Sequence, residues 1–151
     1  MKTDTDTFTF TRSMPLPPDR MWHLMTDPTQ REAWGAPGDA VLQTIHADTR
    51  IGGTERHRCG PADNPEFEVE TRWFHLDAPT NAVFTEQIEA GGTALGAGLV
   101  TYRIEADGTG SSVAITVAVS SFVGPEMIGE FKDGWEGGLA NLERVAKGSI
   151  A

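Results

Sequence analysis

The stretch that decides the fold is Gly124–Lys147, which reads GPEMIGEFKDGWEGGLANLERVAK. Its apolar side chains recur at intervals of three and four residues, so they share one side of an α-helix. Those side chains are Met127, Ile128, Phe131, Trp135, Leu139, Leu142, Val145 and Ala146. Pro125 suits the first helical position, where a missing N–H costs nothing. We therefore predict a long helix here, with one side lying on an apolar surface.

Glycine is the unusual feature of this helix, since Gly129, Gly134, Gly137 and Gly138 all interrupt it. Each glycine costs roughly 0.5–1 kcal/mol of helix stability relative to alanine. Gly138 projects to the middle of the apolar side, and Gly134 projects to its edge. A glycine in such a place either lets another backbone come close or leaves room under the helix. We expect Gly138 and Gly134 to face a sheet and to border a cavity.

The upstream segments supply the surface on which the helix can lie. Most of them alternate apolar and polar residues and are separated by turns rich in Gly, Pro and Asp, as is typical of antiparallel strands. The predicted strands are Thr7–Ser13, Ala40–Ala47, Thr54–Cys59, Glu66–Leu76, Ala82–Glu89, Ala94–Glu105 and Ser112–Ser121. Proline introduces two short predicted helices after the first strand, Pro17–Thr26 and Asp27–Trp34. This order predicts an α+β fold, in which a curved antiparallel sheet of about six or seven strands wraps around the C-terminal helix.

Composition restricts the class of protein. The 151 residues are 38% hydrophobic and 23% charged, which predicts one folded domain over residues 1–151. The formal net charge of −10 argues against nucleic acid and anionic membrane surfaces as partners. Cys59 is the only cysteine, which excludes an internal disulfide and fits a reducing compartment. No signal peptide or membrane span is visible in the sequence, so we expect a cytoplasmic protein.

Five short motifs stand in a fixed order along the chain. They are Met21–Pro28 with Trp34, Asp48–Gly53, Asp77–Pro79 followed by Val83–Thr85, Asp107–Gly110, and Gly134-Trp135 with Leu139 and Leu142. In this order they resemble the START-like (SRPBCC, helix-grip) superfamily, in the branch named for the activator of the heat-shock protein 90 ATPase. The resemblance covers roughly Phe8 to Val145. It departs from the family at Trp34–Pro37, where many members carry a second tryptophan.

The resemblance implies a helix-grip fold and a ligand cavity between sheet and helix. Members of the superfamily bind lipids, hormones and polyketides, and some act as cyclases or hydrolases. The walls of such a cavity are predicted to come from Trp34, Glu55, His57, Phe84, Tyr102, Phe131, Trp135 and the gap at Gly138. Among these aromatic side chains, Tyr102 is the best candidate to offer a ligand a polar group, its hydroxyl. For each aromatic side chain, ordinary core packing is the alternative interpretation.

Polar residues on the strands are the candidates for chemistry. Glu55, His57 and Cys59 share one face of a strand, and a histidine beside a thiol can act as base for a thiolate nucleophile. Alternatively, this face meets solvent or only lines a pocket. Glu86 and Arg72 are either buried charges that fix the polar end of a ligand or members of cross-strand surface pairs.

The histidines lie on different predicted elements and lack the spacing of metal motifs, so no metal site is predicted, and no cofactor motif is present. Three functions follow: binding of a small hydrophobic molecule, a cyclase- or hydrolase-like enzyme that uses Glu55, His57 and Tyr102 as acids or bases, and a co-chaperone that binds a heat-shock ATPase. The third rests on the family name. A homodimer through a sheet edge is left open.

Overall fold

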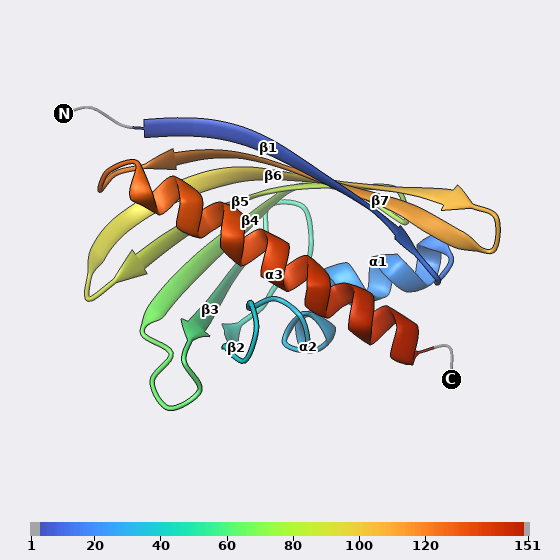
Figure 1. Cartoon of the computed structure of the whole chain (residues 1–151), viewed down its shortest axis with the longest axis horizontal. Coiled ribbons are helices and arrows are strands. Elements are labelled where there is room, and N and C mark those ends of the chain that lie inside the picture. Colours follow the sequence, from blue (N-terminus) through green and yellow to red (C-terminus); the bar gives the residue numbers. More distant parts are fainter. Residues whose placement is uncertain (1–3, 150–151) are drawn as a thin grey trace.

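The computed structural model describes residues 4–149. Its strands form one antiparallel sheet of seven strands in the order β1-β7-β6-β5-β4-β3-β2 (Figure 1). The strands are β1 (Asp4–Met14), β2 (Val41–His46), β3 (Thr54–Gly60), β4 (Phe67–Asp77), β5 (Asn81–Ala90), β6 (Thr93–Asp107) and β7 (Gly110–Ser121). Because β2 to β7 follow one another as a meander, only β1 crosses over, to pair with β7 at the far edge.

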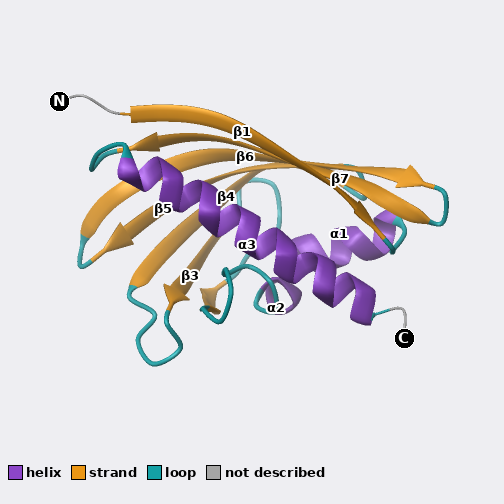
Figure 2. Cartoon of the chain, viewed as in Figure 1, coloured by secondary structure: helices purple, strands orange, loops and turns teal. Residues whose placement is uncertain are grey.

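The helices lie on one face of this sheet. α1 (Pro18–Thr26) and α2 (Pro28–Arg31) follow β1, and α3 (Glu126–Gly148) closes the described chain. Figure 2 shows α3 crossing the concave face obliquely, with the strands curving around it. The predicted α+β helix-grip fold is therefore confirmed, including both short helices and the long C-terminal one.

Several element boundaries differ from the prediction. α2 ends at Arg31 rather than at Trp34, because the next N–H groups bond to carbonyls three residues back: Ala33 N to Gln30 O at 3.1 Å and Trp34 N to Arg31 O at 3.2 Å. β1 extends beyond the predicted Thr7–Ser13, since its backbone pairs with β7 from Asp4 to Met14. α3 begins one residue after Pro125, which is its N-cap rather than its first helical residue.

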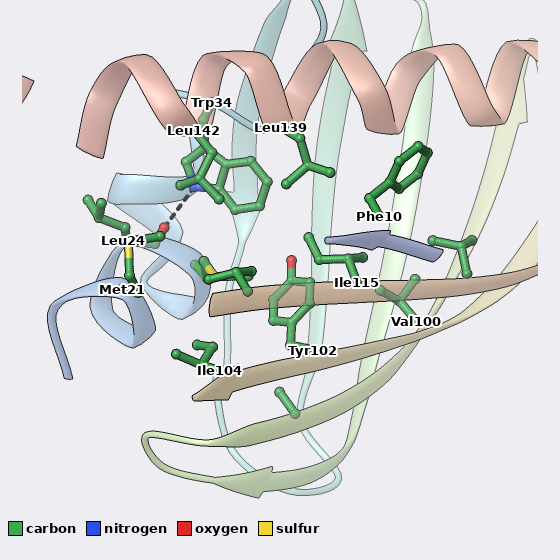
Figure 3. Packing of buried hydrophobic residues seen from close by; sticks show 14 of the residues in the cluster. Phe10, Met21, Leu24, Trp34, Val100, Tyr102, Ile104, Ile115, Leu139 and Leu142 are labelled. Atoms are coloured by element: carbon green, nitrogen blue, oxygen red, sulfur yellow. Dashed lines mark hydrogen bonds between the residues drawn. The ribbon is translucent and has the colours of Figure 1, made fainter. Parts of the chain in front are cut away.

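The core lies between the concave face, α1 and the C-terminal half of α3. The predicted inward faces of β6 and β7 are buried: Val100, Tyr102, Ile104, Val113, Ile115, Val117 and Val119. Figure 3 shows side chains of β6 and β7 meeting Leu139 and Leu142 of α3. Trp34 joins this cluster and donates its indole N–H to the Leu24 carbonyl at 2.8 Å (Figure 3). These contacts fix α3 over β1 and β7.

The glycines of α3 have two different surroundings. A Cβ at Gly137 would lie 2.5 Å from Pro37 Cβ, and one at Gly138 would lie 3.3 Å from the Trp34 carbonyl oxygen. The loop after α2 therefore approaches the helix closely, and Asn141 Nδ2 ties it down by donating to the Ala36 carbonyl at 2.7 Å. Around Gly129 and Gly134, by contrast, a Cβ would meet nothing within 4 Å.

Candidate functional site

A pocket of about 760 Å³ lies between the N-terminal half of α3 and strands β2 to β6. It forms because α3 packs on β1 and β7, so the helix leaves the other half of the concave face uncovered. The loop after α2 and the loop after β3 form the remaining walls. A pocket of this size suits small organic molecules, whose sites usually have about 300–1,000 Å³.

Five of the predicted site residues line this pocket: Trp34, His57, Phe131, Trp135 and Gly138. Gly134, also expected at the cavity, lines it too. Phe131 reaches its place because Gly96 lacks a side chain, since a Cβ there would lie 2.8 Å from the Phe131 ring. Further apolar lining comes from Leu42, Phe67, Val69, Ile88, Leu95 and Met127.

Glu55, Phe84 and Tyr102 do not line the pocket, which corrects their predicted place in its wall. Phe84 and Tyr102 have no exposed surface and pack ring against ring, with centroids 5.1 Å apart. The Arg31 guanidinium lies over Phe84, with its Cζ 5.6 Å from the ring centroid. Since Arg31 also lines the pocket, its guanidinium lies between the Phe84 ring and the open volume.

The Tyr102 hydroxyl points from the sheet toward α3 (Figure 3). It is buried and has no hydrogen-bond partner within the described chain. Burial raises the pKa of Tyr102 far above its ordinary value, an effect that the nearby Arg31 charge opposes. A hydroxyl that is sealed off and holds its proton tightly is placed neither to contact a ligand nor to act as an acid.

A buried ion pair fixes Arg31. Its Nη1 lies 3.2 Å from Glu55 Oε1, and both side chains are nearly without exposed surface. Thr49 donates its hydroxyl hydrogen to Glu55 Oε2 at 2.6 Å, and His57 Nε2 lies 3.3 Å from Oε1. Burial alone would raise the pKa of Glu55, but the hydrogen bonds from His57 and Thr49 and the charge of Arg31 outweigh it and hold the pKa at about 2. Glu55 is thus an ionised residue that positions Arg31 and His57.

The predicted trio of Glu55, His57 and Cys59 does not form a thiolate site. His57 uses one ring nitrogen for Glu55, and the other, Nδ1, lies 3.2 Å from Thr44 Oγ1. Burial and the nearby Glu86 carboxylate raise the pKa of the Cys59 thiol. A nucleophilic cysteine needs the opposite shift. Cys59 therefore contributes to the wall as a neutral side chain.

Glu86 is the one buried carboxylate on the lining among residues 4–149. It is 9% exposed, and Trp135 donates its indole N–H to Oε1 at 3.2 Å. Burial raises the pKa of Glu86, which the Arg31 charge and the Trp135 hydrogen bond only partly offset. In the sheet, Glu86 lies between Thr71 of β4 and Gly98 of β6, and neither residue donates a hydrogen bond to its carboxylate. Arg72, for which a buried position and a surface pair were both open, is exposed.

The sequence contained a signal for Glu86 but none for Arg31. Glu86 alternates with Phe84 and Ile88 on one strand, so an inward carboxylate was one of the predicted alternatives. Arg31 lies in a helix of four residues that has no periodicity to read. Its position depends on Glu55, which is distant in the chain.

Two classes of feature are missing from the described part of the chain. In residues 4–149, no three His, Cys, Asp or Glu residues are grouped so that they could hold a metal ion. None of the helices in that range combines the length and apolarity needed to cross a bilayer.

Comparison with known proteins gives one family. The family model described as "Polyketide cyclase / dehydrase and lipid transport" matches residues 5–147. No curated protein sequence gives a significant match.

Solved structures share the fold over nearly the whole chain. Mll3558 from Rhizobium loti is 25% identical with a TM-score of 0.83, and the match covers 95% of this chain and 99% of that one. An uncharacterised protein from Rhizobium leguminosarum is 24% identical with a TM-score of 0.82 and 97% of each chain covered. CV1439 from Chromobacterium violaceum is 20% identical with a TM-score of 0.81, with 93% of this chain and 96% of that one covered.

Proposed function

We propose a ligand-binding function, proceeding from the fact that this chain belongs to the family described as "Polyketide cyclase / dehydrase and lipid transport". The superfamily resemblance read from the sequence motifs is thereby confirmed, whereas the branch named for the heat-shock ATPase activator stays a prediction. The proposed ligand is a small, largely apolar molecule held between α3 and the sheet.

The pocket itself is the observation that carries this proposal. Its volume of about 760 Å³ suits a small organic molecule, and its lining is mainly apolar and aromatic with a few buried polar side chains. Trp34, Phe131 and Trp135 offer flat apolar surfaces to such a molecule. The missing side chain at Gly134 keeps the helix from filling the space.

Two measurements test the proposal. Native mass spectrometry of the purified protein should find a co-purified molecule or, after delipidation, a bound neutral dye such as Nile red. A thermal-shift screen of apolar small molecules should find ligands that stabilise the protein. A ligand at one hundred times its Kd adds about 2.7 kcal/mol, or roughly 5–10 °C in Tm for a domain of this size. Failure of the dye and of every screened molecule to bind would overturn the proposal.

An enzyme of the cyclase or hydrolase type is the second candidate. The observation that favours it is the buried Glu86 on the lining, because burial raises its pKa and a carboxyl group that keeps its proton more readily is suited to act as a general acid. His57→Ala tests the acid or base role that the sequence predicted for His57, and Glu86→Gln tests the acid role of Glu86. In this reading, Glu86→Gln abolishes conversion of a bound ligand and keeps its binding, whereas unchanged conversion would remove Glu86 from the reaction.

A further inference from the structure

We propose that the ligand carries a hydrogen-bond-donating head group without negative charge, an amine or a hydroxyl, which bonds to Glu86 while an apolar body fills the pocket. This inference rests on the proposed ligand-binding function and specifies its chemistry. It also predicts that the pocket rejects molecules of the same shape that end in a carboxylate.

Few buried polar groups on the lining are free to bind a ligand. The buried ones are Arg31, His57 and Glu86. Both ring nitrogens of His57 already have partners in Glu55 and Thr44. Glu86 uses only Oε1, for the Trp135 indole, and Oε2 has no hydrogen bond from any residue in 4–149. An acceptor of this kind attracts a ligand donor.

Arg31 would attract an anion if it were not paired with Glu55. Its guanidinium is paired with Glu55 at 3.2 Å, and its Nε is buried out of reach of solvent. Glu55 already balances the charge of Arg31, so an anionic ligand that reaches the guanidinium gains less attraction there than it would at an unpaired arginine. An anion that broke the Arg31–Glu55 pair would incur a further cost, because an unpaired buried charge is strongly destabilising.

The exposed part of the pocket lining is negatively charged. The exposed charged residues on the lining are Asp39, Asp63 and Glu130, and all of them are acidic. They give the exposed part of the lining a negative potential, which repels anions and attracts cations. Burial adds to this effect at Glu86, since a second negative charge beside a desolvated carboxylate is poorly screened.

The experiment compares ligands that differ only in the head group. Decylamine, decan-1-ol and decanoate form one series, and naphthylmethylamine, naphthylmethanol and naphthoate form a second one with a flat body. Binding at pH 7.5 is followed by displacement of Nile red. We expect the carboxylate to bind about tenfold more weakly than the amine or alcohol, since a like-charge contact is unfavourable. An amine stronger than the alcohol indicates an ionised Glu86, and the reverse order a protonated one.

Glu86→Gln keeps the size of the side chain and an oxygen that can accept from Trp135, and it should remove most of the discrimination against the carboxylate. Glu136→Gln is the matched control, because it also removes one negative charge, at an exposed position of α3 that is not on the pocket lining. We expect it to change the ranking by less than about twofold, since exposed charges are screened.

The outcomes separate the two proposals. A carboxylate that binds as tightly as its amine in either series overturns the head-group inference and leaves ligand binding intact. Binding of Nile red with no binding of any amine or alcohol overturns it as well. Failure of Nile red and of both series overturns the ligand-binding function, and the inference falls with it.

Discussion

Replacing Gly134 by leucine should fill part of the pocket and stabilise the free protein at the same time. A Cβ at this position meets nothing within 4 Å, and the residue lines the pocket, so an isobutyl group can enter without moving the backbone. Leucine is a better helix former than glycine by roughly 0.5–1 kcal/mol. Apolar contact of the new side chain with the pocket wall can add to that gain.

Gly129→Leu is the matched control. It lies in the same helix, a Cβ there also meets nothing within 4 Å, and it is exposed and away from the pocket lining. Both variants should therefore raise Tm by about 1–4 °C. Only Gly134→Leu should weaken ligand binding, as measured by displacement of Nile red. The expected loss is at least about tenfold, which corresponds to about 1.4 kcal/mol.

The refuting result is a Gly134→Leu protein that is more stable and still binds Nile red as the wild type does. Binding would then occur outside the volume under α3. Gly138→Leu is a poorer test. Its Cβ would lie 3.3 Å from the Trp34 carbonyl oxygen, so lost binding could come from a displaced loop.

Two further variants test the layer beneath the pocket. Tyr102→Phe removes a buried hydroxyl that has no partner within residues 4–149, so the free energy of unfolding in urea should stay equal or rise by up to about 1 kcal/mol, with ligand affinity unchanged. A loss of ligand affinity would instead show that Tyr102 belongs to the binding site. Glu55→Gln should flatten the acid limb of the stability profile. The pKa of Glu55 is about 2 in the folded protein against 4.5 ordinarily. The unfolded chain therefore holds a proton that the folded protein has lost, and stability rises with pH through that window by up to about 3 kcal/mol. Urea unfolding of the wild type and of Glu55→Gln, at those pH values of the window at which both are folded, measures the difference. Stability profiles that run parallel would contradict the low pKa of Glu55.

The periodic elements could be predicted from the sequence because their signals are local. Alternation identified the buried faces of β6 and β7, and the three- and four-residue spacing identified α3. The site was predicted less well, since alternation tells which face is inward but not what covers it. Tyr102 and Phe84 are inward as expected, yet the core and Arg31 cover them. Only the tertiary position of α2 decides this.

The glycines of α3 show the same limit. Their positions on the helix predicted that something approaches the backbone or that space remains, and the structure contains both cases within a few residues. Gly137 meets Pro37, whereas Gly134 faces open volume. The sequence could not assign these roles, because they depend on the course of the loop after α2.

The pocket stays open because each of its sides is held by something other than the apolar contacts that would close it. The loop after α2 is held to α3 by the bond from Asn141 to the Ala36 carbonyl. On the floor, Arg31 is held by Glu55, and breaking such a buried pair costs about 3–5 kcal/mol. Collapse of the helix onto the sheet would bury the free oxygen of Glu86 without a partner, which is itself unfavourable. A ligand with a donor group at that point removes this obstacle, so the group that prevents collapse of the empty pocket is also the one expected to select its occupant.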